Sequence, residues 1–573
     1  MHDWLTRNRT GRDATDLTSI RSNAYVDSEG RVVLPEALRA RFGLDAGAQL
    51  HIDVNGNGFV VRRPITQLAR VYVEPTNACN LTCRTCIRNN WDEALDQAAK
   101  KINAISKNYG PDAVAVFGSP RLNNEELDLL QKWVRSGFKT NQIASFNHML
   151  NGHDLDGLDE MYGLTASTAT MDDFKNADVI MVLNAELTEN NLVAELKIKE
   201  AMKKGARLVT VSSSANALSK IADLWLDPKR GTNTALLAGL AGVLIRKEKC
   251  DGDFISRRTE NFSQYQASLD KLDRKRAIET TGIAADKFDR IVDMLSDAPN
   301  LIVVYGIDQC LEKSKDDLKA LGNLLLQMGK SGQPGNGLIL VSEFANYQGL
   351  LDMGVDPRYL PGGVRCGDPA ISRLQKMWDI PSDKFFKAID LKERLDSGKI
   401  KALVIFGENP LASASAGKWL AAAEFKLVVD FFMTASASEA DVVLPASTPL
   451  ESTGTFTACD RRVQRSQAIF PPKSGMANWE IISRLSEKTS FPMPYTSTND
   501  IFKEIQQANP FYQNVEIGGF WGGNLLQESF FTQNGKGKFM PLTIATTTCN
   551  QEKPPLLASE NYIQVKIKSK LVV

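Results

Sequence analysis

The chain has 573 residues, which is enough for roughly three or four domains of ordinary size. Its 68 basic and 68 acidic residues balance to a net charge of +0, which argues against a general nucleic-acid or anionic-membrane surface. The eight cysteines are mostly isolated, the start carries no leader-type apolar segment, and no apolar run approaches the roughly 20 residues of a membrane helix. We therefore expect a cytoplasmic protein with no membrane insertion and no nucleic-acid partner.

Basic residues and histidines are distributed unevenly along the chain. Residues 1–99 contain 12 Arg and no Lys, whereas residues 100–573 contain 38 Lys and 18 Arg, so we infer that the two parts have different histories. The four histidines are His2, His51, His148 and His153. Since no histidine follows residue 153, the long remainder of the chain cannot use Ser–His or Cys–His chemistry.

Residues 25–64 alternate like a small β unit. We expect two strands joined by a Gly turn within 26–35, a short helix at 36–42, and a hairpin around the Asn-Gly-Asn-Gly run at 55–58. This pattern resembles the AbrB-type swapped-hairpin domain, and the resemblance implies a homodimer whose basic residues contact DNA. We favour a β subdomain without a DNA role, because such modules also occur as appendages of enzymes; a DNA-binding regulator is the alternative.

Three cysteines, Cys79, Cys83 and Cys86, form a CxxxCxxC run after an extended stretch at 71–76. Three thiolates on one short loop can hold three irons of a [4Fe–4S] cluster and leave the fourth iron open. The run resembles the start of radical SAM maturases of tungsten oxidoreductases, which implies S-adenosylmethionine as a ligand of the open iron. No Gly-Gly-Glu-type loop follows Trp91, so only the start of that enzyme class is present.

From residue 91 onward, short apolar runs alternate with helical segments. An i, i+3, i+4 apolar stripe predicts a helix at 92–107, and Asn123 with Glu126 predicts a capping box at the next helix. Buried strands are expected at 113–117, 179–183, 208–212, 301–305, 402–406, 427–430 and 442–444. Apolar strands separated by helices predict an α/β fold with two doubly wound parallel-sheet domains. The predicted segments are 1–66 (the β unit), 67–92 (the iron–sulfur segment), 93–300 and 301–475 (the α/β domains) and 476–573 (a C-terminal region).

Several loops follow the carboxyl ends of these strands, where open α/β sheets bind ligands. Gly residues in them let backbone N–H groups approach phosphates, and Arg supplies bidentate pairing. The candidate cofactor-binding residues are Gly118, Gly407, Glu408, Asn409, Pro410, Asp430, Thr434, Gly454, Thr455 and Arg462. Each loop alone is a weak signal, and their order and number carry the prediction.

Together these segments resemble the molybdopterin oxidoreductase family, especially formate dehydrogenase catalytic subunits and the large NuoG-like subunit of NADH dehydrogenases. The resemblance spans roughly 91–540, and the residues that carry it lie at 91–95, 109–113, 346–354, 407–410 and 440–464. It implies that the strand-end loops cradle molybdopterin guanine dinucleotide.

The chain also departs from the pattern of this family. Active members place a Cys or selenocysteine on the metal near the stretch at 140–146, yet no Cys lies between Cys86 and Cys250. The four-cysteine cluster domain that usually opens the family, its catalytic His and part of its C-terminal dinucleotide-binding domain also have no counterpart. We therefore expect a degenerate pterin-metal site and a truncated dinucleotide-binding domain within 476–573.

The favoured hypothesis is an electron-transfer or scaffold subunit of a cytoplasmic redox complex, with one [4Fe–4S] cluster on the three cysteines. Its expected partners are other subunits of the complex that carry iron–sulfur or flavin centres. The alternatives are an active molybdenum or tungsten oxidoreductase such as a formate dehydrogenase, a radical SAM maturase fragment, and an AbrB-type DNA-binding protein.

Overall fold

The computed structural model describes residues 25–26, 32–33, 51–55, 58–62, 91–151, 155–270, 272–307, 316–366, 371–379, 389–413, 416–523 and 525–543. The chain divides into two compact units, residues 1–80 and 81–573. In the first unit, β1 (Tyr25–Val26) pairs antiparallel with β2 (Val32–Val33), and β3 (His51–Asn55) pairs antiparallel with β4 (Gly58–Arg62). Both pairs lie where hairpins were predicted. The expected helix at 36–42 and the iron–sulfur residues Cys79, Cys83 and Cys86 lie outside the described residues.

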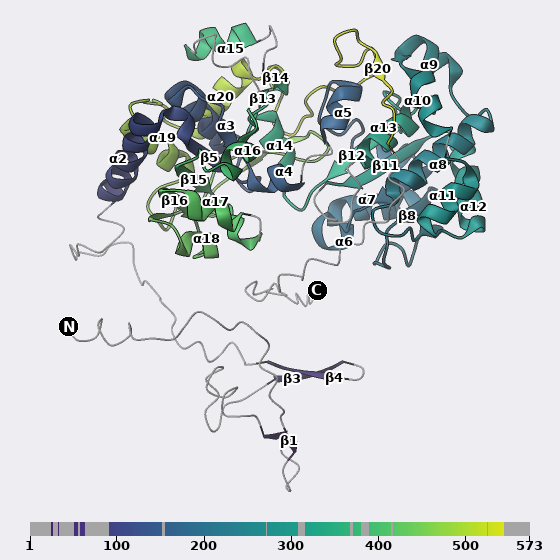
Figure 1. Ribbon diagram of the computed structural model, residues 1–573, viewed down its shortest axis with the longest axis horizontal. Coiled ribbons are helices and arrows are strands. Elements are labelled where there is room, and N and C mark those ends of the chain that lie inside the picture. The colour runs from purple at the N-terminus through teal and green to yellow at the C-terminus, as the bar shows by residue number, and fades with distance from the viewer. Residues whose placement is uncertain are drawn as a thin grey trace. The chain divides into compact units, whose positions relative to one another are not determined.

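The second unit contains two five-stranded parallel sheets (Figure 1). The first sheet has the order β17-β16-β15-β5-β6, and the second has the order β12-β11-β7-β8-β9. The first sheet consists of β5 (Val114–Gly118), β6 (Ile143–Ala144), β15 (Ala402–Phe406), β16 (Phe425–Asp430) and β17 (Val442–Pro445). The second consists of β7 (Val179–Leu183), β8 (Arg207–Val211), β9 (Leu224–Leu226), β11 (Leu301–Gly306) and β12 (Gly337–Val341). These sheets confirm the predicted fold class, because the central strands are apolar and buried along their whole length.

Each sheet takes strands from both sides of residue 300. In the first sheet, Ala402 of β15 pairs with Val114 of β5, and in the second, Leu301 of β11 pairs with Val179 of β7. The chain thus leaves the first sheet after β6, builds the second sheet, and returns to complete the first. The predicted segments 93–300 and 301–475 therefore do not correspond to one sheet each, and the domain bounds stay a prediction.

Helices cover the sheets, and the first two α-helices of the second unit lie where the sequence predicted them. Helix α2 (Trp91–Tyr109) matches the helix predicted at 92–107. Helix α3 (Asn124–Lys132) begins with the predicted capping box: the side chain of Asn123 accepts from the N–H of Glu126 at 2.9 Å, and the Glu126 carboxylate accepts from the N–H of Asn123 at 3.1 Å.

The remaining helices are η3 (Pro111–Ala113), the π-helix η4 (Trp133–Phe138), α4 (Phe146–Asn151), α5 (Leu155–Tyr162), η5 (Asp173–Asn176), α6 (Leu187–Asn190), α7 (Leu192–Lys203), α8 (Asn233–Arg246), α9 (Gly252–Arg258), α10 (Phe262–Leu269), α11 (Arg274–Thr281), α12 (Ala285–Ser296), α13 (Asp317–Gln327), α14 (Tyr347–Asp352), α15 (Ile371–Trp378), α16 (Leu391–Asp396), η6 (Pro410–Ala412), α17 (Gly417–Ala422), α18 (Ala435–Ser438), α19 (Asn478–Lys488) and α20 (Thr498–Ala508). Short strand pairs are β10 (Thr259–Glu260) with β20 (Gly537–Lys538), β13 (Tyr359–Leu360) with β14 (Val364–Arg365), and β18 (Gly454–Thr457) with β19 (Val463–Ser466). Among the described residues, no helix combines the length and the apolar character that crossing a membrane requires.

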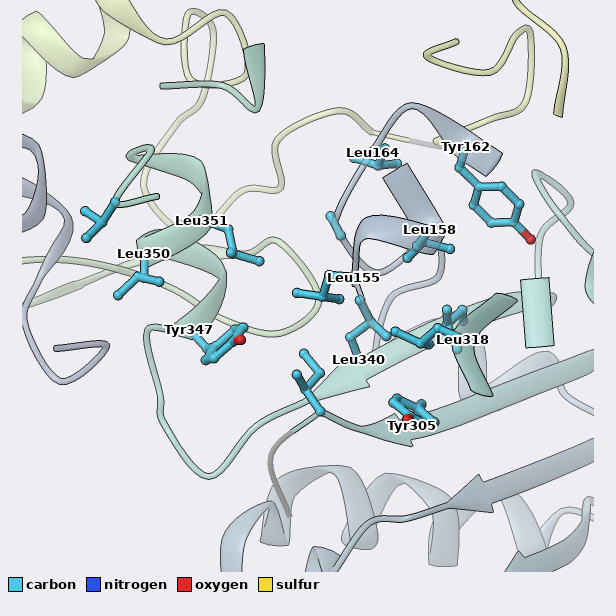
Figure 2. Close-up of a cluster of buried hydrophobic side chains, with 14 of the residues drawn as sticks. Leu155, Leu158, Tyr162, Leu164, Tyr305, Leu318, Leu340, Tyr347, Leu350 and Leu351 are labelled. Carbon is cyan, nitrogen blue, oxygen red and sulfur yellow. The ribbon is translucent and has the colours of Figure 1, made fainter. Parts of the chain in front are cut away.

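One apolar core cluster contains residues from strands of both sheets, and Figure 2 shows the part of it around α5, α13 and α14. Leu155 and Leu158 of α5 lie in the same buried cluster as Leu318 of α13 and Leu340 of β12. Helix α14 adds Leu350 to the same cluster. Burial of this kind contributes about 1.5–3 kcal/mol for each large apolar side chain, so this shared core stabilises the packing of the second unit.

Candidate functional site

A cavity of about 630 Å³ lies at the carboxyl ends of the strands of the first sheet. Gly407 follows β15, Phe431 follows β16, and Arg121 lies in the loop after β5; all three line the cavity. Asn190 and Phe344, which follow β7 and β12 of the second sheet, complete the opposite wall. The volume is in the usual range for cofactor sites, and the carboxyl edge of a parallel sheet is where such sites form.

Arg121 places a cation in the wall of the cavity. Its guanidinium lies 4.8 Å from the centre of the Phe344 ring and donates a hydrogen bond to the carbonyl of Gly407 at 3.3 Å. Gly407 has a φ of +67°, a left-handed conformation in which a glycine carries no steric penalty. The arrangement suits a phosphate group, because a guanidinium pairs with phosphate oxygens through two N–H donors.

The floor of the cavity is polar and buried. Asn123, Glu126, Ser452 and Asn478 line it, and each is at most 5% exposed. The hydroxyl of Ser452 donates to the Glu126 carboxylate at 2.9 Å and accepts from the Asn123 amide at 3.3 Å. Burial raises the pKa of Glu126 to about 7, against the hydrogen bonds from Asn123 and Ser452 that lower it. A carboxyl group that changes charge near neutral pH therefore faces the cavity.

Gly407 is the one predicted cofactor-binding residue that lines this cavity in the part of the chain that the structure describes. Glu408 instead points into the protein, where it accepts hydrogen bonds from Ser145 and the following backbone. Pro410 opens the 3-10 helix η6, and the Asn409 side chain accepts from the N–H and hydroxyl of Ser436 at 3.1 and 2.8 Å. These residues build the loop whose first position, Gly407, reaches the cavity.

The predicted residues after β16 stabilise their own turns. Asp430 accepts from the N–H of Phe432 at 3.2 Å, and burial raises the pKa of its carboxyl. Thr434 accepts from the N–H of Ala437 at 3.1 Å at the start of α18. Their neighbour Phe431 forms part of the cavity wall.

The other predicted residues lie next to the cavity lining. A Cβ at Gly118 would contact Leu127 and Leu130 of α3, so this glycine permits close helix packing. Gly454 and Thr455 pack on the start of α3, where the N–H of Thr455 donates to Glu125 at 2.7 Å. Arg462 pairs with Asp172 at 3.1 Å and lies 3.9 Å from the centre of the Phe520 ring. The assignment of these residues to cofactor binding stays a prediction.

Arg121 was not predicted from the sequence, and the floor residues other than Asn478 were predicted to lie in strand-end loops but not to bind a cofactor. Arg121 lies in the loop Gly118–Ser119–Pro120–Arg121 directly after a buried strand, but a single Arg in a loop has no distinguishing spacing. Asn123 and Glu126 were predicted to form a capping box in one of the strand-end loops, but not to bind a cofactor. The capping geometry turns both side chains toward Ser452. Their position at the start of a helix after a parallel strand was the available signal.

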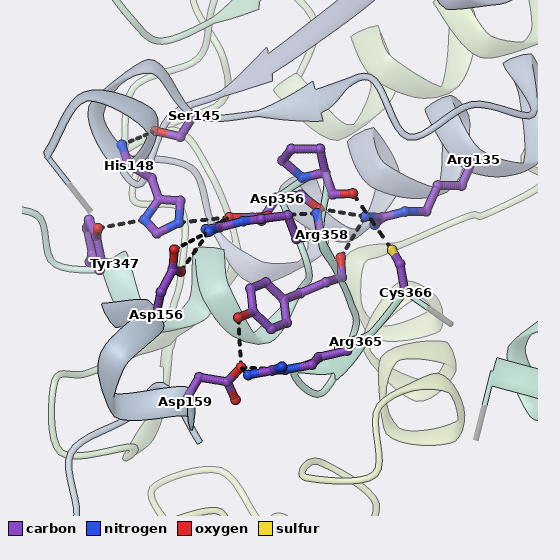
Figure 3. A network of polar contacts seen from close by, with 12 residues as sticks. Arg135, Ser145, His148, Asp156, Asp159, Tyr347, Asp356, Arg358, Arg365 and Cys366 are labelled. Carbon is purple, nitrogen blue, oxygen red and sulfur yellow. Dashed lines mark hydrogen bonds and ion pairs between the residues drawn. The ribbon is translucent and has the colours of Figure 1, made fainter. Parts of the chain in front are cut away.

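A polar network surrounds the stretch at 140–148 (Figure 3). His148 Nε2 lies 2.9 Å from a carboxylate oxygen of Asp356, and its Nδ1 lies 2.8 Å from the hydroxyl of Tyr347. Arg358 donates to the same Asp356 carboxylate at 2.8 Å. Burial raises the pKa of Asp356, but the hydrogen bonds from His148 and Arg358 outweigh burial and hold this pKa well below its usual range.

Polar atoms of two amide side chains in this stretch are buried without a hydrogen-bond partner among the described residues. Both polar atoms of Gln142 and Oδ1 of Asn147 are unpaired, although Gln142 is fully buried. Unpaired buried amides normally bind water or a polar ligand. In the described ranges, the structure shows no group of three or more His, Cys, Asp or Glu side chains arranged to hold a metal ion.

The comparison with known proteins assigns this architecture to a family. The profile of the family described as molybdopterin oxidoreductase matches residues 87–488. The chain belongs to the molybdopterin oxidoreductase family, as its sequence predicted.

The relatives of this chain include formate dehydrogenases. The chain is 30% identical over 508 residues to F420-dependent formate dehydrogenase 2 subunit alpha of Methanococcus maripaludis, with 83% of this chain and 74% of the relative covered. It is 29% identical over 479 residues to formate dehydrogenase H of Escherichia coli, with 78% and 67% covered. Among solved structures, acetylene hydratase from Pelobacter acetylenicus matches with a TM-score of 0.62 at 17% identity, covering 85% of this chain and 75% of that one. This structural likeness shows the shared fold.

Proposed function

We propose that this chain is an electron-transfer or scaffold subunit of a formate dehydrogenase-like redox complex, with a pterin cofactor site that is retained in the cavity. The observation that carries this proposal is the cavity itself. It lies at the carboxyl edges of both sheets, and its wall contains Arg121, which donates a hydrogen bond to the carbonyl of Gly407. These residues fit the phosphates of molybdopterin guanine dinucleotide, which supplies a redox metal centre when bound. In our proposal, Arg121 pairs with a phosphate, and Glu126 holds a proton at the cavity floor.

The stretch at 140–146 supports a role other than formate turnover. No Cys lies between Cys86 and Cys250, so this stretch cannot supply the thiolate that the family resemblance implies. Ser145 cannot replace it in the observed conformation, because its hydroxyl donates to the Glu408 carboxylate at 2.6 Å and the residue is fully buried. We therefore propose that electrons pass between a [4Fe–4S] cluster bound by Cys79, Cys83 and Cys86 and partner subunits that carry iron–sulfur or flavin centres.

Metal and pterin analysis of anaerobically purified protein tests this function. We expect iron at the stoichiometry of one [4Fe–4S] cluster, a matching paramagnetic signal after reduction, and no formate-dependent reduction of viologen dyes. Protein that lacks iron, or that oxidises formate in proportion to its molybdenum or tungsten content, would contradict the proposal. A C79S variant is the control for the cluster, since it should lose iron without changing the pterin content.

An active molybdenum or tungsten oxidoreductase is the second candidate function. The retained cavity of about 630 Å³ with Arg121 favours it. Formate-dependent dye reduction by protein loaded with molybdenum or tungsten would select this candidate over the first. The radical SAM hypothesis rests on cysteines outside the described residues, and the DNA-binding hypothesis rests on residues 25–64, of which strands β1–β4 are described. Both stay predictions, which cleavage of S-adenosylmethionine under reduction and a DNA gel-shift assay would test.

A further inference from the structure

The backbone at residues 145–147 is held by a carboxylate from a distant loop. Oε1 of Glu408 accepts from the hydroxyl of Ser145 at 2.6 Å and from the N–H of Asn147 at 3.3 Å, while Oε2 accepts from the N–H of Phe146 at 2.8 Å. Glu408 is 5% exposed, so water does not compete for these bonds. One buried carboxyl group thus accepts all three hydrogen bonds, and together they fix the first turn of α4.

The same segment is held from its other side by His148. The imidazole lies between the Tyr347 hydroxyl and the Asp356 carboxylate, and Arg358 and Asp156 continue this network (Figure 3). With both of its ring nitrogens in contact at 2.8 and 2.9 Å, His148 leaves α4 little freedom to rotate.

Glu408 also adjoins the cavity through its neighbour in the chain. Gly407 lines the cavity, and its carbonyl accepts from Arg121 at 3.3 Å, while its N–H donates to Val429 at 2.9 Å. A ligand that draws Arg121 away from this carbonyl therefore acts on the residue next to Glu408. The ring of Phe146 stacks at 3.8 Å on Phe117, the last residue but one of β5, so the held segment lies against the same strand ends.

We propose that Glu408 is a positioning residue that couples the occupied state of the cavity to the conformation of residues 145–148. The Glu408 carboxyl group fixes residues 145–148. When Arg121 moves to pair with a bound anion, its hydrogen bond to the Gly407 carbonyl changes, and this shifts the neighbouring Glu408. The coupling rests on the proposed function, in which the cavity binds the phosphates of a pterin nucleotide. The fixing of the segment follows from the contacts of Glu408 alone.

Hydrogen exchange on the full-length protein measures the fixing directly. In E408Q the amide N–H₂ replaces one acceptor and faces the N–H donors, so we expect the backbone amides of Phe146 and Asn147 to exchange roughly 10-fold faster or more. S145A removes one donor and leaves the two backbone bonds, so its effect should be smaller. E408D keeps the charge on a shorter side chain and should restore part of the protection. E424Q is the matched control, because Glu424 is an exposed residue of the same unit that contacts Tyr109.

Pterin retention measures the coupling. Released pterin fluorescence after denaturation should fall several-fold in E408Q, recover in part in E408D, and remain at the wild-type level in E424Q. Unchanged exchange at Phe146 and Asn147 would overturn the proposal, and so would faster exchange with unchanged pterin retention. If wild-type protein binds no pterin, the cofactor part of the proposed function fails. The coupling is then tested by hydrogen exchange at the Gly407 amide in E408Q. An exchange rate at this amide equal to that of the wild type would overturn the proposed coupling.

Discussion

The side chain of Asn123 fills the space that any side chain at position 454 would need. A Cβ atom placed on Gly454 overlaps the amide of Asn123, and this amide is held in place by its hydrogen bond to Ser452 at 3.3 Å. Asn123 also caps α3 through the N–H of Glu126 at 2.9 Å. Asn123 therefore connects the start of α3 with the loop that contains Ser452 and Gly454.

G454A should therefore lower stability and disturb the cavity floor. The added methyl group displaces the Asn123 amide, and overpacking of this kind costs about 1–3 kcal/mol, to which loss of the helix cap adds about 1 kcal/mol. Urea unfolding of the full chain measures the change. G252A is the control, because a Cβ there meets nothing within 4 Å, and it should shift stability by less than about 1 kcal/mol in either direction. Equal stability of the two variants would refute the steric argument.

Stability should fall as the pH rises from about 5 to about 8. Burial raises the pKa of Glu126, Asp128, Asp352 and Glu408 to about 7 and of Glu125 to about 8. In this window the folded protein binds more protons than the unfolded chain, so the free energy of unfolding decreases with pH, by up to about 1.4 kcal/mol per unit for each group. Asp356 has a lowered pKa, so its contribution is lost only when the pH falls below the ordinary range of an aspartate.

Denaturant unfolding across this pH range checks the sign. E125Q removes the group with the highest of these pKa values and should flatten the pH dependence, whereas E200Q on the exposed face of α7 should leave it unchanged. Stability that rises steadily from pH 5 to pH 8 would contradict the prediction.

Local features of the fold could be predicted from the sequence, and long-range pairing could not. The parallel strands and the capping box of Asn123 follow from patterns within a few residues. The pairing of β5 with β15 could not be predicted, because the sequence of an apolar strand does not specify which other strand pairs with it. For the same reason the loop of Glu408 was placed correctly at a strand end, while the direction of its side chain, toward Ser145, depends on a partner 263 residues away.

R135A should be among the most destabilising single substitutions in the described chain. Arg135 is fully buried and donates to the carbonyls of Gly354, Asp356 and Tyr359 at 2.8, 2.9 and 2.7 Å and to the side chain of Asn141 at 3.1 Å. Truncation leaves these acceptors unpaired in the interior, which costs about 3–5 kcal/mol. R135K provides three donors in a different geometry and should recover part of the loss.

Thermal and urea unfolding measure this effect. The control is R257A, which removes an exposed pair with Asp253 and should change stability by less than about 1 kcal/mol. The prediction would fail if R135A were as stable as R257A.

R121A should reduce the pterin content of the purified protein without lowering its stability. Arg121 is exposed; its side chain donates one hydrogen bond to Gly407 at 3.3 Å and stacks on Phe344, and its charge partly offsets the rise in the pKa of Glu408 and Asp430 that burial causes. Since its one side-chain hydrogen bond lies in the cavity wall, we expect little change in stability. A charge-assisted pair with phosphate contributes about 1.5–3 kcal/mol, which corresponds to a loss of affinity of about 10- to 100-fold. R121K keeps the charge without the planar fork and should lose less. R257A serves again as the control, and pterin fluorescence after denaturation with a parallel unfolding curve is the measurement. Equal pterin content in R121A and R257A would place the anion site elsewhere than at Arg121.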